Sequence, residues 1–247
     1  MKTITKSEVA VTTALFLLIS SLVLILLLSG CTYERIEGNN HLTNEMRNSD
    51  PFDEVISFGD FQVNILPDSV TTLEIKAESN ILPYLYTISD GSTLRIGYRN
   101  GFNIHAHFPV EVIVHTPHAR ILRLQGSGSI KCNGFNEPDV KLYLSGSGSM
   151  NCGFSAGSLK AEIAGSGEME LSGSVTSSDF RISGSGNIQS LEMPQKSCSA
   201  NISGSGDVYV AASEQLDVHI SGSGNVYYSG EPQISSSISG SGKVKKY

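Results

Sequence analysis

The sequence predicts an all-β fold, a right-handed parallel β-helix, and the main observation behind this prediction is a repeat. Gly-Ser-Gly occurs seven times in the second half of the chain, at intervals of 18 to 20 residues. A period of this length corresponds to one coil of a β-solenoid, so each copy is expected to mark one of seven coils. The first glycines of the copies are Gly126, Gly146, Gly165, Gly184, Gly204, Gly222 and Gly240.

A second observation is that the apolar residues around each copy alternate with a period of two. One lies two positions before the first glycine and another lies four positions after it, like Leu124 and Ile130 in the first copy. A period of two indicates strands rather than helices. If the backbone stays extended, the glycines point inward and the serine points outward. Inward glycines indicate either close approach of another wall or a corner with unusual dihedral angles, and both explanations stay open.

Other repeat folds of similar period fit the sequence less well. Calcium-binding nonapeptide repeats need an Asp after the glycines, but the position three residues after the first glycine holds Asp only once, at Asp207. Leucine-rich repeats need a leucine consensus with Asn or Cys, which this repeat lacks. A left-handed hexapeptide helix should keep a fixed period, whereas this period drifts by up to two residues.

The N-terminus predicts export and lipid attachment. A short basic region precedes an apolar run of 15 residues, and Ser29-Gly30-Cys31 follows the run like a bacterial lipobox. The alternative is a transmembrane anchor, but the run is shorter than the ~20 residues that a spanning helix needs. We therefore expect residues 1–30 to be a lipoprotein signal peptide and Cys31 to carry the lipid that anchors the protein to a membrane. Because Thr32 rather than Asp follows the cysteine, the outer membrane is the expected location.

The rest of the chain is expected to divide into a tether and one domain. Residues 31–50 are polar and rich in Asn, which predicts a lipidated, flexible tether. Residues 51–247 are expected to form a single β-helix domain, because alternating strand patterns begin near Phe52. Asp90-Gly91 predicts a hairpin turn between strands at 84–88 and 94–98. No segment after residue 31 shows the pattern of an amphipathic helix.

The order of several motifs resembles that of a known family. These motifs are Phe52-Asp-Glu-Val, Phe61-Gln-Val, the Asp90-Gly91 hairpin, the strand from Val110 to Pro117, and the Gly-Ser-Gly coils with Asn187-Ile188 and Asn225-Val226. Together they are similar to the head GIN domain of the putative auto-transporter adhesins, over a region from about residue 52 to the C-terminus. The resemblance implies a right-handed β-helix related in shape to pectin lyases, without their catalytic residues, and a role in cell adhesion.

Charged outward positions favour a structural role over catalysis. Register places Glu162 opposite Arg181, and Lys160 opposite Asp179, on adjacent coils. Such pairs of opposite charge stabilise stacked strands by ~0.2–1 kcal/mol each. We therefore expect no catalytic residues, with an enzyme acting on surface polysaccharide as the alternative.

Two histidine-containing patterns are candidates for reactive sites. Asp217 and His219 share a strand face, but no serine nucleophile motif accompanies them. His105-Ala-His107 has a metal-like spacing, with both imidazoles on one side of a strand. No cysteine or carboxylate completes an evident ligand set, so neither a metal nor another cofactor is expected.

Cysteines outside the lipobox are expected inside the coils. Cys132 and Cys152 occupy equivalent positions in adjacent coils, about 4.8 Å apart along the stack. This spacing lies within the range for a disulfide. Side chains in a parallel stack point the same way, however, so a ladder of buried free thiols is the alternative. Cys198 has no evident partner.

The serine of each Gly-Ser-Gly copy is the candidate binding residue, since outward serines would stack into a ladder of hydroxyl groups. Such an array can bind glycans or protein through repeated weak hydrogen bonds, although small polar residues also suit a tight turn. Without Lys2, Lys6 and Glu8 of the expected signal peptide, the chain has 15 basic and 23 acidic residues, a difference of −8, which argues against nucleic acid or anionic lipid as the partner. The candidate serines are Ser127, Ser147, Ser166, Ser185, Ser205, Ser223 and Ser241, and the ladder is extended by Ser145, Ser183, Ser203, Ser221 and Ser239.

These observations predict a non-catalytic envelope lipoprotein that acts as an adhesion or surface-binding module. The membrane is the expected partner through the lipid, and a glycan or protein is the expected ligand. A purely structural envelope protein is a further alternative. Lysines at the C-terminal edge are expected to oppose pairing with a second copy, since like charges would meet there; they are Lys243, Lys245 and Lys246.

Overall fold

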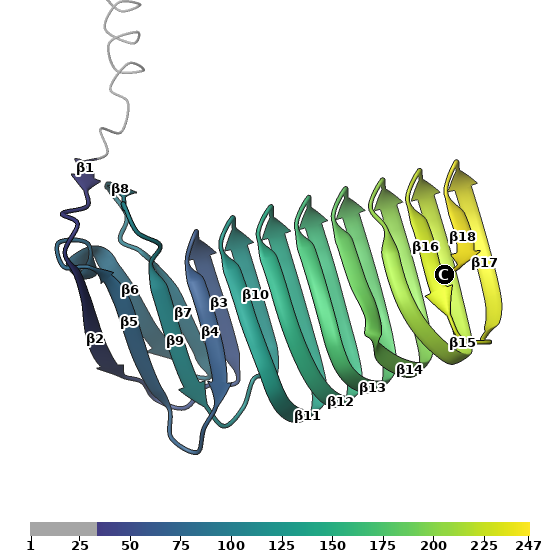
Figure 1. Ribbon diagram of the computed structural model, residues 1–247, viewed down its shortest axis with the longest axis horizontal. Coiled ribbons are helices and arrows are strands. Elements are labelled where there is room, and N and C mark those ends of the chain that lie inside the picture. Colours follow the sequence, from purple (N-terminus) through teal and green to yellow (C-terminus); the bar gives the residue numbers. More distant parts are fainter. Residues whose placement is uncertain (1–33) are drawn as a thin grey trace, which may run out of the picture.

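The computed structural model describes residues 34–247, which form an all-β structure (Figure 1). The expected signal peptide and the expected lipidation site at Cys31 lie outside these residues. Sixteen strands belong to one sheet, and β1 (Glu34–Glu37) and β8 (Phe102–His105) form a separate two-stranded sheet. The only helix within residues 34–247 is the short 3-10 helix η1 (Leu82–Tyr84). No helix in this part of the chain is long and apolar enough to cross a membrane.

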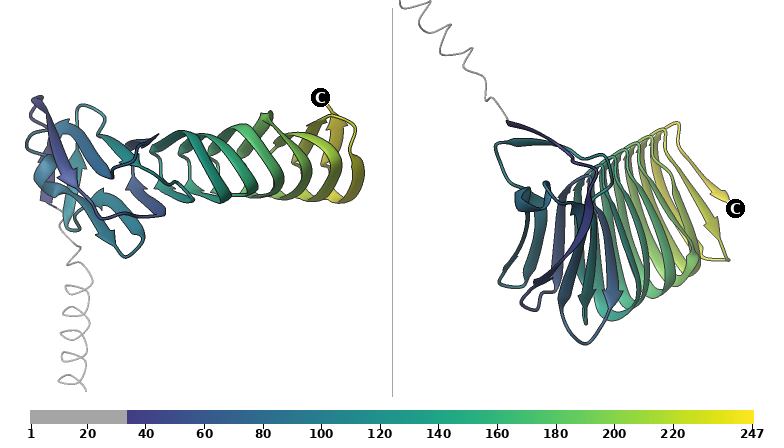
Figure 2. Two further views of the ribbon diagram at one scale, coloured as in Figure 1. Left: turned by 90° about the horizontal axis from the view of Figure 1, so that it is seen from below. Right: turned by 60° about the vertical axis from the view of Figure 1, so that its left-hand side comes forward.

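The larger part of the sheet is a β-solenoid of about seven turns, which confirms the predicted fold class. Most coils consist of one long strand that follows the bends from one Gly-Ser-Gly turn to the next and pairs in parallel with the coil before it. Figure 2 shows these coils stacked along one axis. The coil strands are β10 (Ile121–Gly126), β11 (Ser129–Gly146), β12 (Ser149–Gly165), β13 (Glu168–Gly184), β14 (Asn187–Gly204) and β15 (Val208–Gly222).

The C-terminal end of the stack consists of shorter strands. β16 (Asn225–Ser229) pairs with the start of β15, β18 (Lys243–Lys246) pairs with β16, and β17 (Gln233–Gly240) pairs with the end of β15. All eight residues of β17 are exposed. Ile238 is 40% exposed, although the equivalent residue is buried in the six earlier coils.

Strands that precede the repeat extend the solenoid and close its N-terminal end. β3 (Glu54–Gly59) and β4 (Gln62–Pro67) pair in parallel with β10 and β11 and form one more coil. Beyond them, β9 (Glu111–Thr116) and β5 (Thr72–Glu78) follow β4, while β7 (Thr93–Tyr98) and β6 (Leu85–Asp90) follow β3. β6 and β7 are antiparallel, with Asp90 opposite Thr93 and Gly91 at a φ of 60°, so the predicted hairpin is confirmed.

The prediction of a flexible tether over residues 31–50 does not hold for residues 34–48. β1 pairs in parallel with β8, and β2 (Leu42–Asn48) pairs antiparallel with β5 along its whole length. The polar composition misleads because most side chains of both strands are exposed, and backbone hydrogen bonds rather than apolar packing hold them in place. We call β2, β5, β6, β7, β8 and η1, together with the turn that joins β7 to β8, the N-terminal cap.

Inward residues of the coils form one continuous core. Leu124 and Ile130, which flank the first Gly-Ser-Gly copy, are fully buried, and equivalent residues line the following coils. Cys132 and Cys152 lie in register on adjacent coils as buried free thiols, so the arrangement found is the thiol ladder and not the disulfide. Burial raises the pKa of Cys152 to about 12, which keeps the thiol protonated and unreactive.

The two glycines of each copy are required for different reasons. The first glycine has a positive φ, between 120° and 137°, which side chains other than hydrogen disfavour. The second glycine does not, but a Cβ there would collide with the previous coil. At Gly186 it would lie 2.5 Å from the oxygen of Gly167 and 2.7 Å from Cγ2 of Ile163. Both explanations left open by the sequence therefore apply: the unusual dihedral angle to the first glycine, and the close approach of the previous coil to both.

An eighth copy of this turn lies at Gly59, where Gly-Ser-Gly is absent from the sequence. Gly59 has a φ of 117° and stands opposite Gly126. Its carbonyl accepts hydrogen bonds from the N–H groups of Ser127 and Gly128 at 3.1 and 3.0 Å. Phe61 replaces the second glycine, and the centroid of its ring lies 4.6 Å from that of Tyr98. A bulky residue fits because the strands behind it, β7 and β9, are not joined by a turn at this corner.

Candidate functional site: a serine groove

The seven candidate serines lie at the exposed corner that joins successive coils. Each serine N–H donates to the carbonyl of the first glycine one coil earlier, at 2.9–3.1 Å. These backbone bonds hold the serines in one column. Within residues 34–247, no hydrogen bond engages their hydroxyl groups, which leaves the hydroxyls available to a ligand. The column consists of Ser127, Ser147, Ser166, Ser185, Ser205, Ser223 and Ser241.

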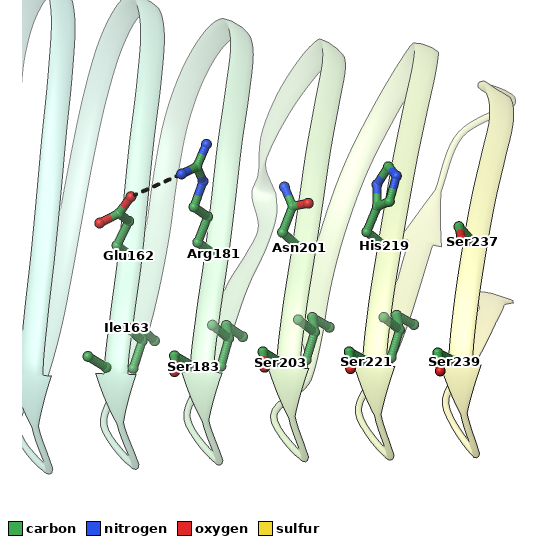
Figure 3. Close-up of a pocket in the computed structure, with 14 residues that line it drawn as sticks. Glu162, Ile163, Arg181, Ser183, Asn201, Ser203, His219, Ser221, Ser237 and Ser239 are labelled. Atoms are coloured by element: carbon green, nitrogen blue, oxygen red, sulfur yellow. Dashed lines mark ion pairs between the residues drawn. The ribbon is translucent and has the colours of Figure 1, made fainter.

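A shallow groove of about 580 Å³ runs beside this column, on the strands that lead into the turns (Figure 3). One row of its lining residues is mostly large and polar and lies three positions before the first glycine: Glu162, Arg181, Asn201, His219 and Ser237. The next row lies one position before the glycine and is small: Ala164, Ser183, Ser203, Ser221 and Ser239. The step from large to small side chains hollows the face. We call this surface the serine groove.

Ion pairs set the charge at one end of the serine groove. Glu162 stands opposite Arg181, and Lys160 opposite Asp179, as the register predicted. The contacts differ in part: Arg181 binds Asp179 on its own strand at 2.9 Å and reaches Glu162 at 3.8 Å. Lys160 pairs with Glu162 at 2.7 Å instead of with Asp179. The hydrogen bond to Asp179 raises the pKa of Arg181, and the two cations and two anions balance.

The other end of the serine groove holds His219, which stands between Asn201 and Ser237 in the row of large residues. Asp217, two residues earlier, accepts a hydrogen bond from Nε2 of Gln215 at 2.7 Å. A carboxylate that assists a catalytic histidine must bind and orient its ring. In the part of the chain that the structure describes, no such bond joins Asp217 to His219.

A polar row on the other side of the turns caps the strands that leave them. The N–H of Asp207 donates to Oδ1 of Asn187 at 3.0 Å. The N–H and Nδ2 of Asn225 donate to Oδ1 of Asp207 at 2.7 and 2.9 Å. In the sequence, this row stands out only as a poor match to a calcium motif. Residues 34–247 contain no group of three or more side chains placed to hold a metal ion.

Tyrosines stack two residues beyond that polar row. The ring centroids of Tyr209 and Tyr227 lie 4.7 Å apart at an interplanar angle of 13°. Tyr247 meets Tyr209 edge-on at 6.2 Å, and Nζ of Lys245 lies 5.6 Å from the Tyr227 ring. Because the tyrosine faces contact one another and a lysine, this cluster stabilises the last coils rather than offering an open aromatic platform.

Sequence reasoning missed a buried carboxylate at Glu78, which explains the histidine pair. Glu78 is 0% exposed and accepts hydrogen bonds from the N–H groups of Asn40 at 2.6 Å and His107 at 2.8 Å. Nδ1 of His107 lies 3.2 Å from the same carboxylate. Burial raises the pKa of Glu78, but these bonds outweigh it and hold the pKa below its ordinary value. His107 is therefore a hydrogen-bond partner of Glu78. His105 is exposed.

A second buried carboxylate, Glu137, holds the segment that leads into the repeat. It contacts Nδ1 of His118 and Nε of Arg120, both at 3.0 Å, and accepts the N–H of Ala119 at 3.2 Å. Nothing in the local sequence marks either glutamate as buried, because their partners lie 17 to 38 residues away.

Comparison with protein families identifies the chain. The family model described as "Putative auto-transporter adhesin, head GIN domain" matches residues 51–232. This chain belongs to that family. The match confirms the resemblance derived from the motifs. A search of curated proteins gives no match.

Solved structures show the same fold. A structure titled a putative adhesin from Bacteroides fragilis superposes with a TM-score of 0.82 at 19% identity, covering 86% of this chain and 100% of its own. A structure titled a putative lipid binding protein from Parabacteroides distasonis gives 0.73 at 26% identity, covering 87% and 100%. A structure titled a putative adhesin from Parabacteroides merdae gives 0.71 at 19% identity, covering 87% and 99%.

Proposed function

We propose that this head GIN protein is a non-catalytic envelope lipoprotein that binds an extended glycan along the serine groove. The observation that supports this most directly is the groove itself, a hollow on a stack of coils that combines polar side chains with the apolar surface of four isoleucines. Its polar groups are one ion pair, an amide, an imidazole and several hydroxyls, and the isoleucines are Ile163, Ile182, Ile202 and Ile220. The family description and the titles of similar structures are consistent with adhesion at a cell surface. The alternative is a β-helix enzyme that acts on surface polysaccharide.

The spacing of the serine groove suits a polymer with repeating hydroxyl groups. Adjacent coils lie about 4.8 Å apart, so the five coils from Glu162 to Ser237 extend over about 19 Å. A serine hydroxyl both donates and accepts, which matches sugar hydroxyl groups. Each contact is weak, but contacts repeated along one rigid row add without a further cost of ordering the protein.

The charge of the groove favours a neutral or weakly charged glycan. The ion pairs at the Glu162 end balance, and no lysine lines the groove. The chain carries a net charge of −7, which disfavours nucleic acid and other polyanions.

Filling the groove tests the proposal. Ser203 is exposed and lies in the middle of the small row, so Ser203→Phe should block the groove while leaving the core unchanged. Ser145→Phe is the matched control, because Ser145 occupies the same row and does not line the groove. On a glycan array we expect the parent and Ser145→Phe to capture the same glycans and Ser203→Phe to lose them. Equal capture by both variants would contradict the proposal, and consumption of a captured glycan would favour the enzyme.

The anchor is tested separately. Cys31→Ser should abolish metabolic labelling with palmitate and leave an uncleaved or mislocalised precursor. Labelling that is unchanged in this variant would remove the lipoprotein assignment. Protease treatment of whole cells then distinguishes a surface orientation, in which the domain is cleaved, from a periplasmic one, in which it is shielded.

A further inference from the structure

The first described residues are fixed to the N-terminal cap. The N–H of Glu34 donates to the carbonyl of Gly101 at 3.1 Å, and β1 then pairs with β8. Gly38 packs so closely on the carboxylate of Glu78 that an added Cβ would overlap it. Glu78 also accepts hydrogen bonds from the N–H groups of Asn40 and His107. Together with the pairing of β1 and β8, these contacts hold the segment from residue 34 to residue 40 in one position relative to the cap.

The chain between this fixed segment and Cys31 is very short. Only Thr32 and Tyr33 intervene, and three Cα–Cα steps span at most about 11 Å. The interfacial layer of a bilayer is about 5–8 Å thick on each side of the hydrocarbon core. A lipid on Cys31 would therefore hold the turn at residues 99–101, which receives Glu34, within reach of the head groups.

A second groove opens on this same part of the cap. It has a volume of about 800 Å³ and is lined by β2, η1, β6 and the turn after β7. Arg47 within it is fully engaged, by Glu45 at 2.8 Å and by the carbonyls of Leu85 and Leu82 at 3.2 and 3.3 Å. Arg99 is exposed and forms no ion pair with any residue that the structure describes. We call this surface the cap groove.

The cap groove is amphipathic. Ile88, on its rim, is 53% exposed, and Pro83 beside it is also exposed. An unpaired guanidinium suits a phosphate, which it can bind through two parallel hydrogen bonds. Exposed apolar side chains next to it suit the boundary between head groups and acyl chains.

The geometry points to phospholipid head groups as the occupant of the cap groove, with Arg99 binding a phosphate and Ile88 entering the interface. This inference rests on the proposed lipid at Cys31. In this arrangement the domain stands with its N-terminal cap on the membrane. The serine groove begins three coils beyond the coil of Gly59 and ends seven coils beyond it, which places it about 14 to 34 Å farther along the stack. The glycan site therefore lies farther from the anchoring membrane than the cap does.

Site-specific labelling of the lipidated full-length protein tests this arrangement. The described cysteines are buried and protonated, so a fluorophore can be attached selectively to Asn100→Cys or, as the distal control, to Ser237→Cys. The proteins are placed in vesicles of phosphatidylethanolamine and phosphatidylcholine, whose head groups carry a phosphate but no net charge, and the vesicles contain a lipid with a nitroxide on its head group. We expect loss of fluorescence at position 100 and none at position 237. Equal loss at both positions, or none at position 100, would overturn the inference.

A longer connection separates binding by the cap groove from simple proximity. A flexible Gly/Ser insert of about ten residues between Tyr33 and Glu34 adds an average reach of ~18 Å. If the cap binds lipid, the loss of fluorescence at position 100 persists in this variant. Adding Arg99→Ala to this variant should then abolish the loss of fluorescence at position 100. Arg95→Ala should leave the loss unchanged, because Arg95 lies on β7 outside the groove. Disappearance with the insert alone, or equal effects of the two arginine variants, would contradict head-group binding.

Palmitate labelling of the parent distinguishes a failure of the lipid anchor from a failure of head-group binding by the cap groove. A labelled parent without fluorescence loss at position 100 refutes the cap groove alone. An unlabelled parent refutes the anchor and this inference with it.

Discussion

Replacing the glycines of the fourth copy, Gly184 and Gly186, measures how strongly the turns restrict the sequence. Gly186 lacks a positive φ, so Gly186→Ala adds only a collision. The new Cβ would lie 2.5 Å from a backbone oxygen and 2.7 Å from the buried side chain of Ile163. Neither neighbour is a flexible end that can move away, so we expect the cost of an overpacked core, about 1–3 kcal/mol.

Gly184→Ala adds a second penalty. Its φ is 126°, and an added Cβ would also meet the oxygen of Gly165. Backbone strain of about 1–3 kcal/mol joins a collision of similar size, which gives about 2–6 kcal/mol in total. Gly91→Ala is the control for strain alone, because Gly91 has a φ of 60° and no atom within 4 Å of the added Cβ. We expect it to cost about 1–2 kcal/mol.

Urea unfolding of the soluble domain without Cys31, followed by circular dichroism, measures these differences. Gly184→Ala should lower the free energy of unfolding more than either of the other two variants. If Gly184→Ala costs no more than Gly91→Ala, the previous coil does not block the turn, and the glycines serve only the backbone angle. If Gly186→Ala is neutral, the close approach of adjacent coils is not what excludes side chains there.

Three further predictions follow from the buried groups and the open edge. Hydrogen bonds from Arg120 and His118 outweigh burial and hold the pKa of Glu137 below its unfolded value. Because the unfolded state therefore binds more protons, the stability that Glu137 contributes is lost as pH falls through the folded pKa. Glu137→Gln should flatten the dependence of the urea midpoint on pH between about 5 and 3. Iodoacetamide should label the three described cysteines only after unfolding, since burial raises the pKa of every one of these thiols; labelling of the native protein would contradict the buried ladder. Replacing Lys243, Lys245 and Lys246 of β18 by threonine should promote association through the C-terminal edge of the stack, measured by sedimentation. A triple variant as dispersed as the parent would show that these lysines do not protect the edge.

The coils were predictable because their signals are local. The spacing of Gly-Ser-Gly and the alternation around it determine register, so the amino-acid order alone places Cys132 opposite Cys152 and Glu162 opposite Arg181. The hairpin at Gly91 was predictable for the same reason, since a turn of two residues depends on its own sequence.

The N-terminal part was harder because its contacts are distant and made by backbone. β1 and β2 have few buried side chains, so no apolar pattern marks them, and their partners lie 24 to 68 residues away. Glu78 looks like any surface glutamate until the chain folds Asn40 and His107 over it. The turn at Gly59 was missed because Phe61 can replace a glycine only where no earlier turn stacks behind it.

The rows of side chains that line the serine groove were predictable from the register of the repeat, but the groove that they form was not. Each turn must keep its glycines, since the previous coil leaves no room for a side chain, so the turns themselves cannot vary. Variation is confined to outward rows, and the row before the turns changes along the stack from Glu162 and Arg181 to Asn201, His219 and Ser237. A ligand lying along the groove therefore meets ion pairs at one end and uncharged donors and acceptors at the other. We therefore expect the proposed glycan to bind in one direction along the groove, and substitutions at the two ends to alter glycan preference differently while leaving the fold intact.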